Sequence, residues 1–211
     1  MDIVQIFDMK TEDIILKRAL EMFNEKGIEY VGLRELATDL KMRVSNINYY
    51  FPTKDDLVDR LSRNLSLLNS QTIFPKDHLD ITSFFEMMDQ VFRNQIQYRC
   101  LLLSFVHLMT QNPRIAERYK ETSINRNSAL TGNLQSLIHN GDLSIESEVE
   151  IAYLVSALAL IIRFWISEAT ISLSQLSIDQ QIKHYLHIIA RLLLPYCSEQ
   201  GKVSLEAFLA L

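Results

Sequence analysis

Residues 40–54 read LKMRVSNINYYFPTK, a stretch that carries Lys41, Arg43 and Lys54 and no acid. This is notable because the 211 residues contain 26 Asp and Glu against 21 Lys and Arg, a formal net charge of −5. The spacing predicts a short helix over 44–50, which Pro52 stops. A helix that reads a DNA groove needs such an acid-free stretch, because a carboxylate there would face phosphates and each basic contact releases counterions.

Two predicted helices precede this stretch. Thr11 can cap the first, whose apolar residues recur at helical spacing until Gly27 ends it. The second begins after Gly32 and runs to Leu40. One supporting helix followed by two short helices, joined by a tight turn at 41–43, has the dimensions of a helix-turn-helix unit.

The composition favours helices throughout the chain. Average usage predicts roughly 25 Gly and Pro in this length, whereas the chain has 5 Gly and 4 Pro. An all-β sandwich or a Gly-rich nucleotide-binding fold is therefore disfavoured. The acidic net charge, taken over the whole chain, argues against a protein that coats nucleic acid non-specifically, but it leaves room for a local basic surface.

Apolar spacing and helix breakers divide the rest of the chain into further helices. They are predicted from Lys54, capped by Thr53, to before Pro75, and over 77–98, 100–110, 112–139, 145–173, 178–194 and 203–211. We therefore predict an all-α protein with a three-helix DNA-binding domain at residues 1–53 and a helical ligand-binding and dimerisation domain at residues 54–211.

Three features bear on the compartment. The first ten residues open with an acid and have no basic region or cleavage site, so we expect no signal peptide. The longest apolar stretch, 152–162, is too short for a membrane span and suits a buried helix. Cys100 and Cys197 have no metal-ligand spacing and are interpreted as reduced thiols. A cytoplasmic location without membrane contact is expected.

The N-terminal part of the chain resembles the TetR family of bacterial transcriptional regulators. The resemblance covers roughly residues 11–61 and rests on Ala19-Leu20 with Phe23 and Gly27, Leu36-Ala37, Ile47 with Tyr49-Tyr50-Phe51, and Lys54-Asp55-Asp56-Leu57. It implies a two-fold dimer built from the last two long helices. The chain departs from the family at three positions, with Lys41 where Gly is usual, Arg43 where a capping Ser is usual, and Asn48 where many members have Tyr.

Nine residues are candidate DNA contacts. Ser45, Asn46 and Asn48 can hydrogen-bond to base edges, and the Tyr49 and Tyr50 hydroxyls can reach the backbone. The cations of the acid-free stretch are expected at phosphates. By the resemblance, Lys54 and Thr11 should clamp flanking phosphates. The alternatives are a solvated basic face and packing of the two tyrosine rings within the module.

The body offers candidates for a ligand pocket, because a mostly apolar cavity with a few polar groups is the usual form of a small-molecule site. They are Phe84, Met88, Phe92, Phe105, His107 and Arg163. Aromatic and Met side chains at this spacing are also ordinary core residues. Arg163 needs an anionic ligand, an internal carboxylate such as Glu168, or a surface position reached by snorkelling.

No catalytic, metal or cofactor site is expected. The chain has no GxSxG, HExxH or P-loop motif, and His184 and His187 form an i, i+3 pair without a third ligand. The leading hypothesis is a homodimeric repressor that a small-molecule effector releases from a palindromic double-stranded operator. A DNA-binding adaptor controlled by a protein partner and a monomeric arrangement of the last helices remain alternatives.

Overall fold

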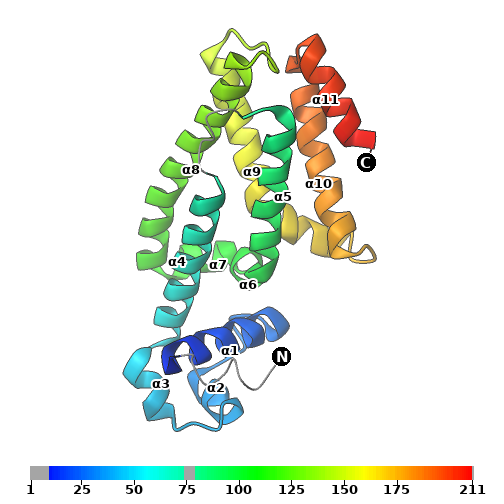
Figure 1. Cartoon of the computed structure of the whole chain (residues 1–211). Coiled ribbons are helices and arrows are strands. Elements are labelled where there is room, and N and C mark those ends of the chain that lie inside the picture. The colour runs from blue at the N-terminus through cyan, green and yellow to red at the C-terminus, as the bar shows by residue number, and fades with distance from the viewer. Residues whose placement is uncertain (1–9, 74–78, 211) are drawn as a thin grey trace. The chain divides into compact units, whose positions relative to one another are not determined.

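The computed structural model describes residues 10–73 and 79–210, which are helical apart from turns, short loops and one isolated bridge between Leu143 and Cys197 (Figure 1). The predicted all-α class is confirmed. The expectations for the first nine residues, for Pro75 and for Asp77 lie outside the described residues. The α-helices are α1 (Thr11–Lys26), α2 (Leu33–Asp39), α3 (Val44–Tyr50), α4 (Lys54–Thr72), α5 (Ile81–Gln97), α6 (Arg99–Leu103), α7 (Phe105–Gln111), α8 (Pro113–His139), α9 (Glu148–Ser172), α10 (Ile178–Leu193) and α11 (Glu199–Ala210), with a 3-10 turn, η2, at Leu194–Tyr196.

The chain divides into two compact units. Unit 1 comprises Met1–Ser66 and Tyr98–Ala116, and unit 2 comprises Leu67–Gln97 and Glu117–Leu211. Unit 1 thus contains α1 to α3, α6 and α7 in full, most of α4, and the first residues of α8. Helix α4 continues from unit 1 into unit 2.

The core of unit 1 forms where α1 and the two short helices α2 and α3 turn their apolar faces toward one another. Ile15, Phe23, Leu36 and Ile47 are all buried. Side chains of α1 also hold α2 from outside this core. Arg18 donates to both carboxylate oxygens of Asp39, and Lys26 forms a 2.6 Å ion pair with Glu35. Asn24 links α1 to α6, because its Oδ1 accepts a hydrogen bond from the Cys100 amide at 3.0 Å.

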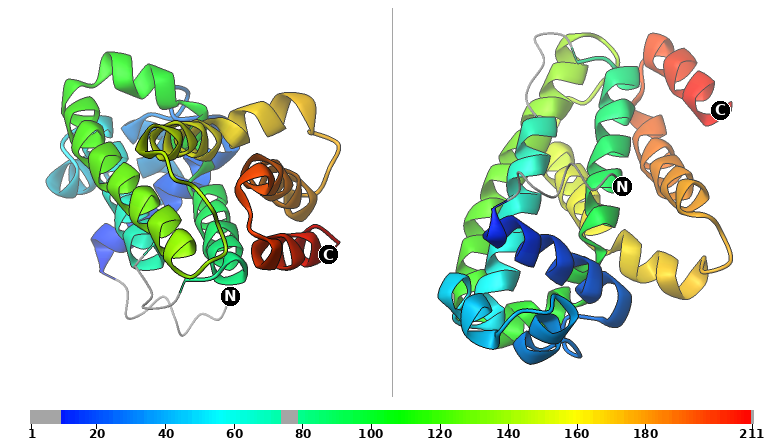
Figure 2. Two further views of the ribbon diagram at one scale, coloured as in Figure 1. Left: turned by 90° about the horizontal axis from the view of Figure 1, so that it is seen from above. Right: turned by 60° about the horizontal axis from the view of Figure 1, so that its bottom comes forward.

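In unit 2, α5 packs against α10 and α11, and α10 packs against α9 (Figure 2). Phe92 of α5 stacks on Trp165 of α9, with ring centroids 4.7 Å apart, and both side chains are buried. The buried Gln95 joins the same two helices through polar contacts. Its Oε1 accepts from the Trp165 indole at 2.6 Å, and its Nε2 donates to the Ile162 carbonyl at 3.1 Å.

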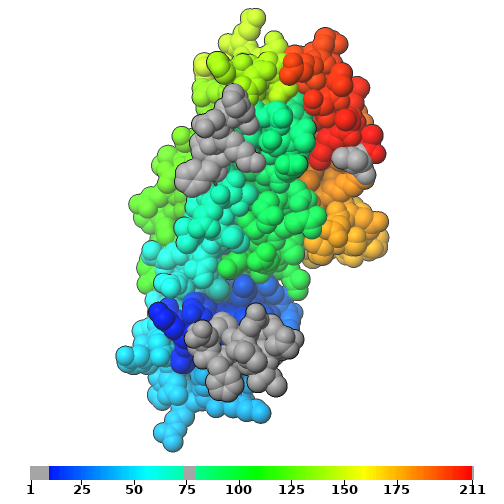
Figure 3. Space-filling model, viewed as in Figure 1, coloured from blue at the N-terminus to red at the C-terminus, as the bar shows by residue number. Residues whose placement is uncertain are grey.

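The buried carboxylate of Asp142 connects the start of α5 to α11. Asp142 accepts from the Ile81 amide at 3.1 Å and from Gln200 Nε2 at 3.4 Å. Helix α11 passes so close that a Cβ on Gly201 would lie 2.0 Å from the Asp142 carbonyl oxygen. Figure 3 shows α10 and α11, in orange and red, against each other on this side of the unit.

Several predicted helix boundaries are wrong. The helix predicted over 100–110 is two helices, because the backbone leaves helical geometry at the buried Ser104, where no Gly or Pro marks a break. Thr11 is the first residue of α1 and not its cap, which is Lys10. The helix predicted from residue 145 begins at Glu148, after Ser147, which caps it. Helix α11 begins at Glu199, ahead of the predicted residue 203.

Both cysteines are free and buried. Burial raises the pKa of the Cys100 thiol to about 12. Burial also raises the pKa of the Cys197 thiol. Buried neutral thiols of this kind are chemically inert.

Candidate nucleic-acid interface

Helix α3 presents a polar surface to solvent. Ser45, Asn46, Asn48 and Tyr49 are exposed, whereas Ile47 on the opposite side is fully buried. The Tyr49 side chain is 81% exposed and the Tyr50 side chain 40%. The Tyr49 ring makes an edge contact with the Tyr50 ring, and the two centroids lie 5.0 Å apart. The helix thus carries hydrogen-bonding groups of the kinds that read base edges and phosphates.

The turn before α3 holds Lys41 in a left-handed conformation, with φ at 54°. The Lys41 amide donates to the Thr38 carbonyl at 3.1 Å, and the Met42 amide donates to the Ala37 carbonyl at 2.9 Å. This geometry favours glycine, because a Cβ clashes there with the following carbonyl. An exposed lysine therefore occupies this position at a cost in backbone energy.

Arg43 occupies the N-cap of α3 and makes no side-chain capping hydrogen bond. Guanidinium groups have only donors, so they cannot accept from the free amides of a helix's first turn. The side chain is exposed. Arg43 thus directly precedes the first-turn amides of α3, and guanidinium groups and helix N-termini both attract anions.

The expected flanking contacts differ in their surroundings. Thr11 is exposed in the first turn of α1. Lys54 is half-buried, and its Nζ donates to the Ile28 carbonyl at 2.9 Å and to the Glu29 carbonyl at 3.4 Å. These bonds tie the start of α4 to the segment after α1, and an ammonium group has three donors. A phosphate contact by Lys54 stays a prediction.

The acids of the neighbouring helix are paired. Hydrogen bonding to Arg18 lowers the pKa of Asp39 and raises the pKa of Arg18. Hydrogen bonding to Glu35 raises the pKa of Lys26. The charges of the α2 carboxylates Glu35 and Asp39 are thus partly neutralised by cations of α1.

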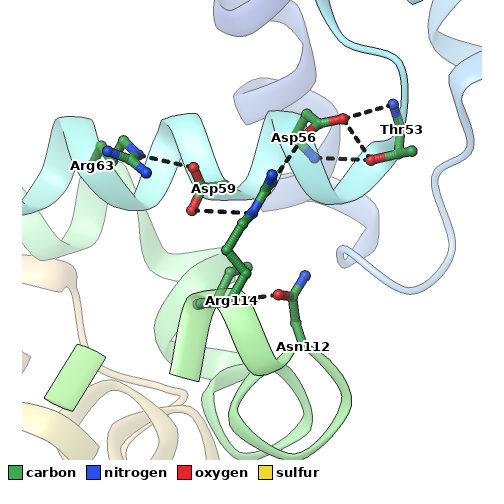
Figure 4. A network of polar contacts seen from close by, with 7 residues as sticks. Thr53, Asp56, Asp59, Arg63, Asn112 and Arg114 are labelled. Atoms are coloured by element: carbon green, nitrogen blue, oxygen red, sulfur yellow. Dashed lines mark hydrogen bonds and ion pairs between the residues drawn. The ribbon is translucent and has the colours of Figure 1, made fainter. Parts of the chain in front are cut away.

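A network at the start of α4 fixes the helix that leaves this module (Figure 4). Thr53 and Asp56 form reciprocal bonds: the Asp56 amide donates to Thr53 Oγ1 at 3.2 Å, and the Thr53 amide donates to the Asp56 carboxylate at 3.0 Å. Arg114 of α8 donates to Asp56 at 2.8 Å. Asp59 accepts from Arg63 at 2.9 Å. Sequence analysis identified the Thr53 cap but missed Asp56, although a Thr three residues before an acid signals such a box.

The pocket candidates separate into two groups. Phe84, Met88 and Phe92 are fully buried in the core of unit 2. Phe105 and His107 belong to α7 in unit 1, where Phe105 is half-buried and His107 is exposed. The three α5 side chains therefore belong to unit 2, which also contains Arg163. The two α7 side chains belong to unit 1.

Arg163 lies against aromatic rings. Its Cζ is 5.4 Å from the centroid of the Tyr119 ring and 5.8 Å from that of Phe164. Glu168, its suggested partner, accepts instead from Ser172 at 2.6 Å and from the Tyr185 hydroxyl at 3.0 Å. Arg126, which bonds to the Tyr119 hydroxyl from the same helix, was not singled out from the sequence, because its polar side chain sits in an otherwise unremarkable helix.

The histidine pair of α10 takes part in ring contacts. His184 meets the Tyr185 ring at 5.2 Å, and His187 meets Phe208 of α11 at 5.9 Å. Burial and the nearby Lys183 and Arg191 lower the pKa of His187. Within residues 10–73 and 79–210, no group of three His, Cys, Asp or Glu side chains is placed to hold a metal ion.

Helix α9 exposes an apolar stripe. Val149, Tyr153, Leu160 and Ile171 are all more than half exposed, and their spacing places them along one side of the helix. By length and composition alone α9 could cross a membrane, although it contains Arg163 and nearly half of its most apolar window is buried inside the protein. The opposite side of α9 supplies core residues such as Leu158 and Trp165.

Two family models match consecutive parts of the chain. Residues 15–61 match the model described as "Bacterial regulatory proteins, tetR family", and residues 63–205 match the model described as "Bacterial transcriptional repressor". The second match alone covers more than half of the chain.

One curated protein matches a short stretch of the sequence, and solved structures match the fold over most of the chain. YttP of Bacillus subtilis (strain 168), described as a "Probable HTH-type transcriptional regulator", is 36% identical over 53 residues, which is 25% of this chain and 26% of that protein. The match thus spans about a quarter of that relative's length. A TetR-family transcriptional regulator from Marinobacter aquaeolei VT8 superimposes with a TM-score of 0.89 at 20% identity, covering 96% of this chain and 98% of that one. The SmeT–triclosan complex gives a TM-score of 0.63 at 14% identity, covering 90% and 93%.

Proposed function

This chain belongs to the TetR family of bacterial transcriptional regulators, and on that premise we propose that it is a homodimeric repressor that a small-molecule effector releases from a palindromic operator. As a family member it is a DNA-binding regulator and not an enzyme. Its site of action is the bacterial cytoplasm, where the chromosome lies. The observation that carries the proposal is the exposed, acid-free surface of α3 and its preceding turn.

In the DNA complex, the polar side chains of α3 read one half-site. Ser45, Asn46 and Asn48 contact base edges in the major groove. Phosphates are held by the cations and hydroxyls around them, which are Thr11, Lys41, Arg43, Tyr49, Tyr50 and Lys54. Phosphate contacts fix the orientation of the helix, and the short polar side chains supply the choice of sequence.

Dimerisation is the second part of the proposal. The exposed stripe of α9 is the kind of surface that self-association covers, because a two-fold axis places the same apolar residues opposite one another. Ile178 and Ile188 of α10 are also exposed and would extend the contact. Two α9 and two α10 helices would then form a four-helix bundle. Such a dimer presents two reading helices to half-sites one helical turn apart, about 34 to 36 Å.

The effector is the third part. Solved relatives include a protein in complex with triclosan, which supports a small molecule as the regulating signal. Helix α4 runs from the unit that contains α3 into the unit that contains α5 and α9. A ligand that binds one arrangement of the body more tightly shifts the population toward that arrangement and changes the spacing of the reading helices.

Selection of bound sequences from random duplex DNA tests the DNA-binding part. We expect an enriched palindrome whose half-sites are one helical turn apart. Arg43→Ala should weaken binding to all sequences and reduce the slope of log affinity against log salt by about 0.9. Asn46→Ala should instead relax the preference at one base position in each half-site.

Lys120→Ala provides the control, because Lys120 is an exposed cation of α8 in unit 2. This variant should keep the affinity and salt slope of the unmodified protein. Failure to enrich any sequence, or equal losses for Arg43→Ala and Lys120→Ala, would contradict the proposed interface.

A further inference from the structure

We infer that unit 2 contains a binding site for a small organic anion, a carboxylate attached to an apolar group, built around Arg126 of α8 with Tyr119 and Arg163. The inference rests on the proposed function, because the anion would be the effector of the repressor. It names the chemical class of that effector from three observations in the body.

The first observation is the incomplete hydrogen bonding of Arg126. Its Nη2 donates to the Tyr119 hydroxyl at 3.2 Å, and its Cζ lies 5.5 Å from the centroid of that ring. The partner is a neutral phenol. The Arg126 Nε is buried and has no hydrogen-bond partner among the described residues. Native proteins rarely leave a buried donor unsatisfied, and each such case calls for an explanation.

The second observation is a second cation at the same ring. The Cζ of Arg163, which comes from α9, lies 5.4 Å from the centroid of Tyr119. Two guanidinium groups from two helices therefore share one aromatic ring in a half-buried setting. Each guanidinium carbon lies within 5.5 Å of the centroid of that ring, and like charges near one another repel more strongly as the surroundings exclude water. An anion bound beside Arg126 would offset this positive charge and accept a charge-assisted hydrogen bond from the Arg126 guanidinium.

The third observation concerns the nearby acids and apolar groups. Glu168 of α9 is occupied by Tyr185 and Ser172, and hydrogen bonding to them lowers its pKa. The Glu168 carboxylate is therefore an ionised group whose hydrogen bonds go to Ser172 and Tyr185. The rings that flank Arg163 are those of Tyr119 and Phe164, and both side chains are half-buried. An apolar group on the ligand suits these neighbours, since burying it contributes about 25 cal/mol per Å².

A buried acceptor adjoins this site in the sequence. Asn127, the residue after Arg126, has a buried Oδ1 with no partner in the described part of the chain. The same turn of α8 thus leaves one donor and one acceptor unsatisfied. A carboxylate satisfies the donor, and a hydroxyl on the same ligand would satisfy an acceptor.

Calorimetric titration of the full-length protein with benzoate, 4-hydroxybenzoate and octanoate tests the site, with benzyl alcohol as the neutral analogue. We expect saturable binding of at least one of the three anions, and binding of benzyl alcohol at least tenfold weaker. Arg126→Met removes the charge while keeping an unbranched side chain, and it should weaken anion binding at least tenfold. Lys120→Met is the matched control, because it removes an exposed charge from the same helix, and it should bind the anions normally.

Thermal unfolding of the unliganded variants separates binding from folding. Arg126→Met should melt no lower than the unmodified protein, because it removes a buried unsatisfied donor and a neighbouring like charge. Anion-dependent increases in melting temperature should then be present in the unmodified protein and absent in Arg126→Met. A lower melting temperature together with an unchanged anion response would show a structural role for Arg126 and overturn the inference.

Other outcomes would also overturn the anion site. These are no saturable binding of any of the three anions, equally tight binding of benzyl alcohol, or unchanged anion affinity in Arg126→Met. Release of the selected operator by neutral or cationic compounds alone would refute the anion site and leave the proposed function standing. An operator that no small molecule releases would refute effector control itself.

Discussion

At the scale of single residues, Lys41 shows how a functional contact competes with backbone energy. Its φ of 54° suits glycine. Lys41→Gly should therefore increase the free energy of unfolding by about 1 kcal/mol. The same change should weaken DNA binding and reduce the salt slope by about 0.9, because one phosphate contact is lost. Urea unfolding and DNA titrations over a range of salt concentrations measure the two effects.

Lys41→Asn is a useful comparison, since asparagine tolerates the left-handed region better than most residues. Its free energy of unfolding should lie between those of the unmodified protein and Lys41→Gly. Its DNA affinity should match that of Lys41→Gly. If Lys41→Gly lowered the stability, the turn would not be strained by its side chain.

Gly201 illustrates a second residue-scale constraint, which is space. Gly201→Ala should destabilise the protein by about 1 to 3 kcal/mol, because its Cβ would meet the Asp142 carbonyl at 2.0 Å and that neighbour is backbone. Gly132→Ala is the matched control. Gly132 lies within α8, and a Cβ added there has no neighbour within 4 Å. This control should stabilise the protein by about 0.5 to 1 kcal/mol. Equal effects on the melting temperature would contradict the close approach.

At the scale of elements, the start of α4 depends on an ionised carboxylate. Hydrogen bonds from Thr53 and Arg114 lower the pKa of Asp56. A carboxyl whose pKa is lower in the folded than in the unfolded state contributes stability above its unfolded pKa of about 3.9. That contribution is lost as the pH falls through the folded value. Unfolding free energy measured by urea should therefore decrease below about pH 4.

Asp56→Asn should be less stable than the unmodified protein at pH 7 and should lose part of this acid sensitivity. Asp55→Asn changes the adjacent exposed acid and should retain the sensitivity. If both variants respond to acid in the same way, Asp56 is not the group responsible.

The elements also show what sequence reasoning can reach. The helices of the DNA-reading module follow from local signals, because Gly27, Gly32 and Pro52 mark their ends and the buried side recurs at helical spacing. The break at Ser104 could not be predicted, since it depends on tertiary packing around a buried residue that carries no breaker signal. Periodicity describes a helix face and contains no information on which neighbour will cover it.

The candidate interface divides in the same way. The absence of acid over residues 40–54 is visible in sequence, and the exposure of Tyr49 agrees with it. That Lys54 donates to the Ile28 carbonyl depends on a contact between residues 26 positions apart. The pairing of Arg163 with Tyr119 spans 44 positions of the numbering. Contacts between residues so far apart in the sequence can be identified only from the three-dimensional structure.

At the scale of the whole molecule, the proposed dimer makes self-association a condition for operator binding. Leu160→Glu places a charge in the middle of the exposed stripe of α9 and should convert the protein to a monomer. Affinity for the selected palindrome should fall at least tenfold, because two linked reading helices bind more tightly than one. Analytical ultracentrifugation and DNA titration measure the two changes.

Ile124→Glu is the control for surface charge, since Ile124 is an exposed apolar residue of α8, outside the proposed contact. It should leave the protein dimeric. A dimer that survives Leu160→Glu, or dissociates equally with Ile124→Glu, would exclude the α9 stripe as its centre.

The pairing of the α2 acids by Arg18 and Lys26 has a consequence for the cell. Cations in these pairs are not available to unrelated DNA, and the whole chain is acidic, with a formal net charge of −5. A bacterial genome offers on the order of 10⁶ or more competing sites. The smaller the surface that attracts any duplex, the fewer molecules are sequestered along the chromosome. A modest copy number then suffices to keep one operator occupied.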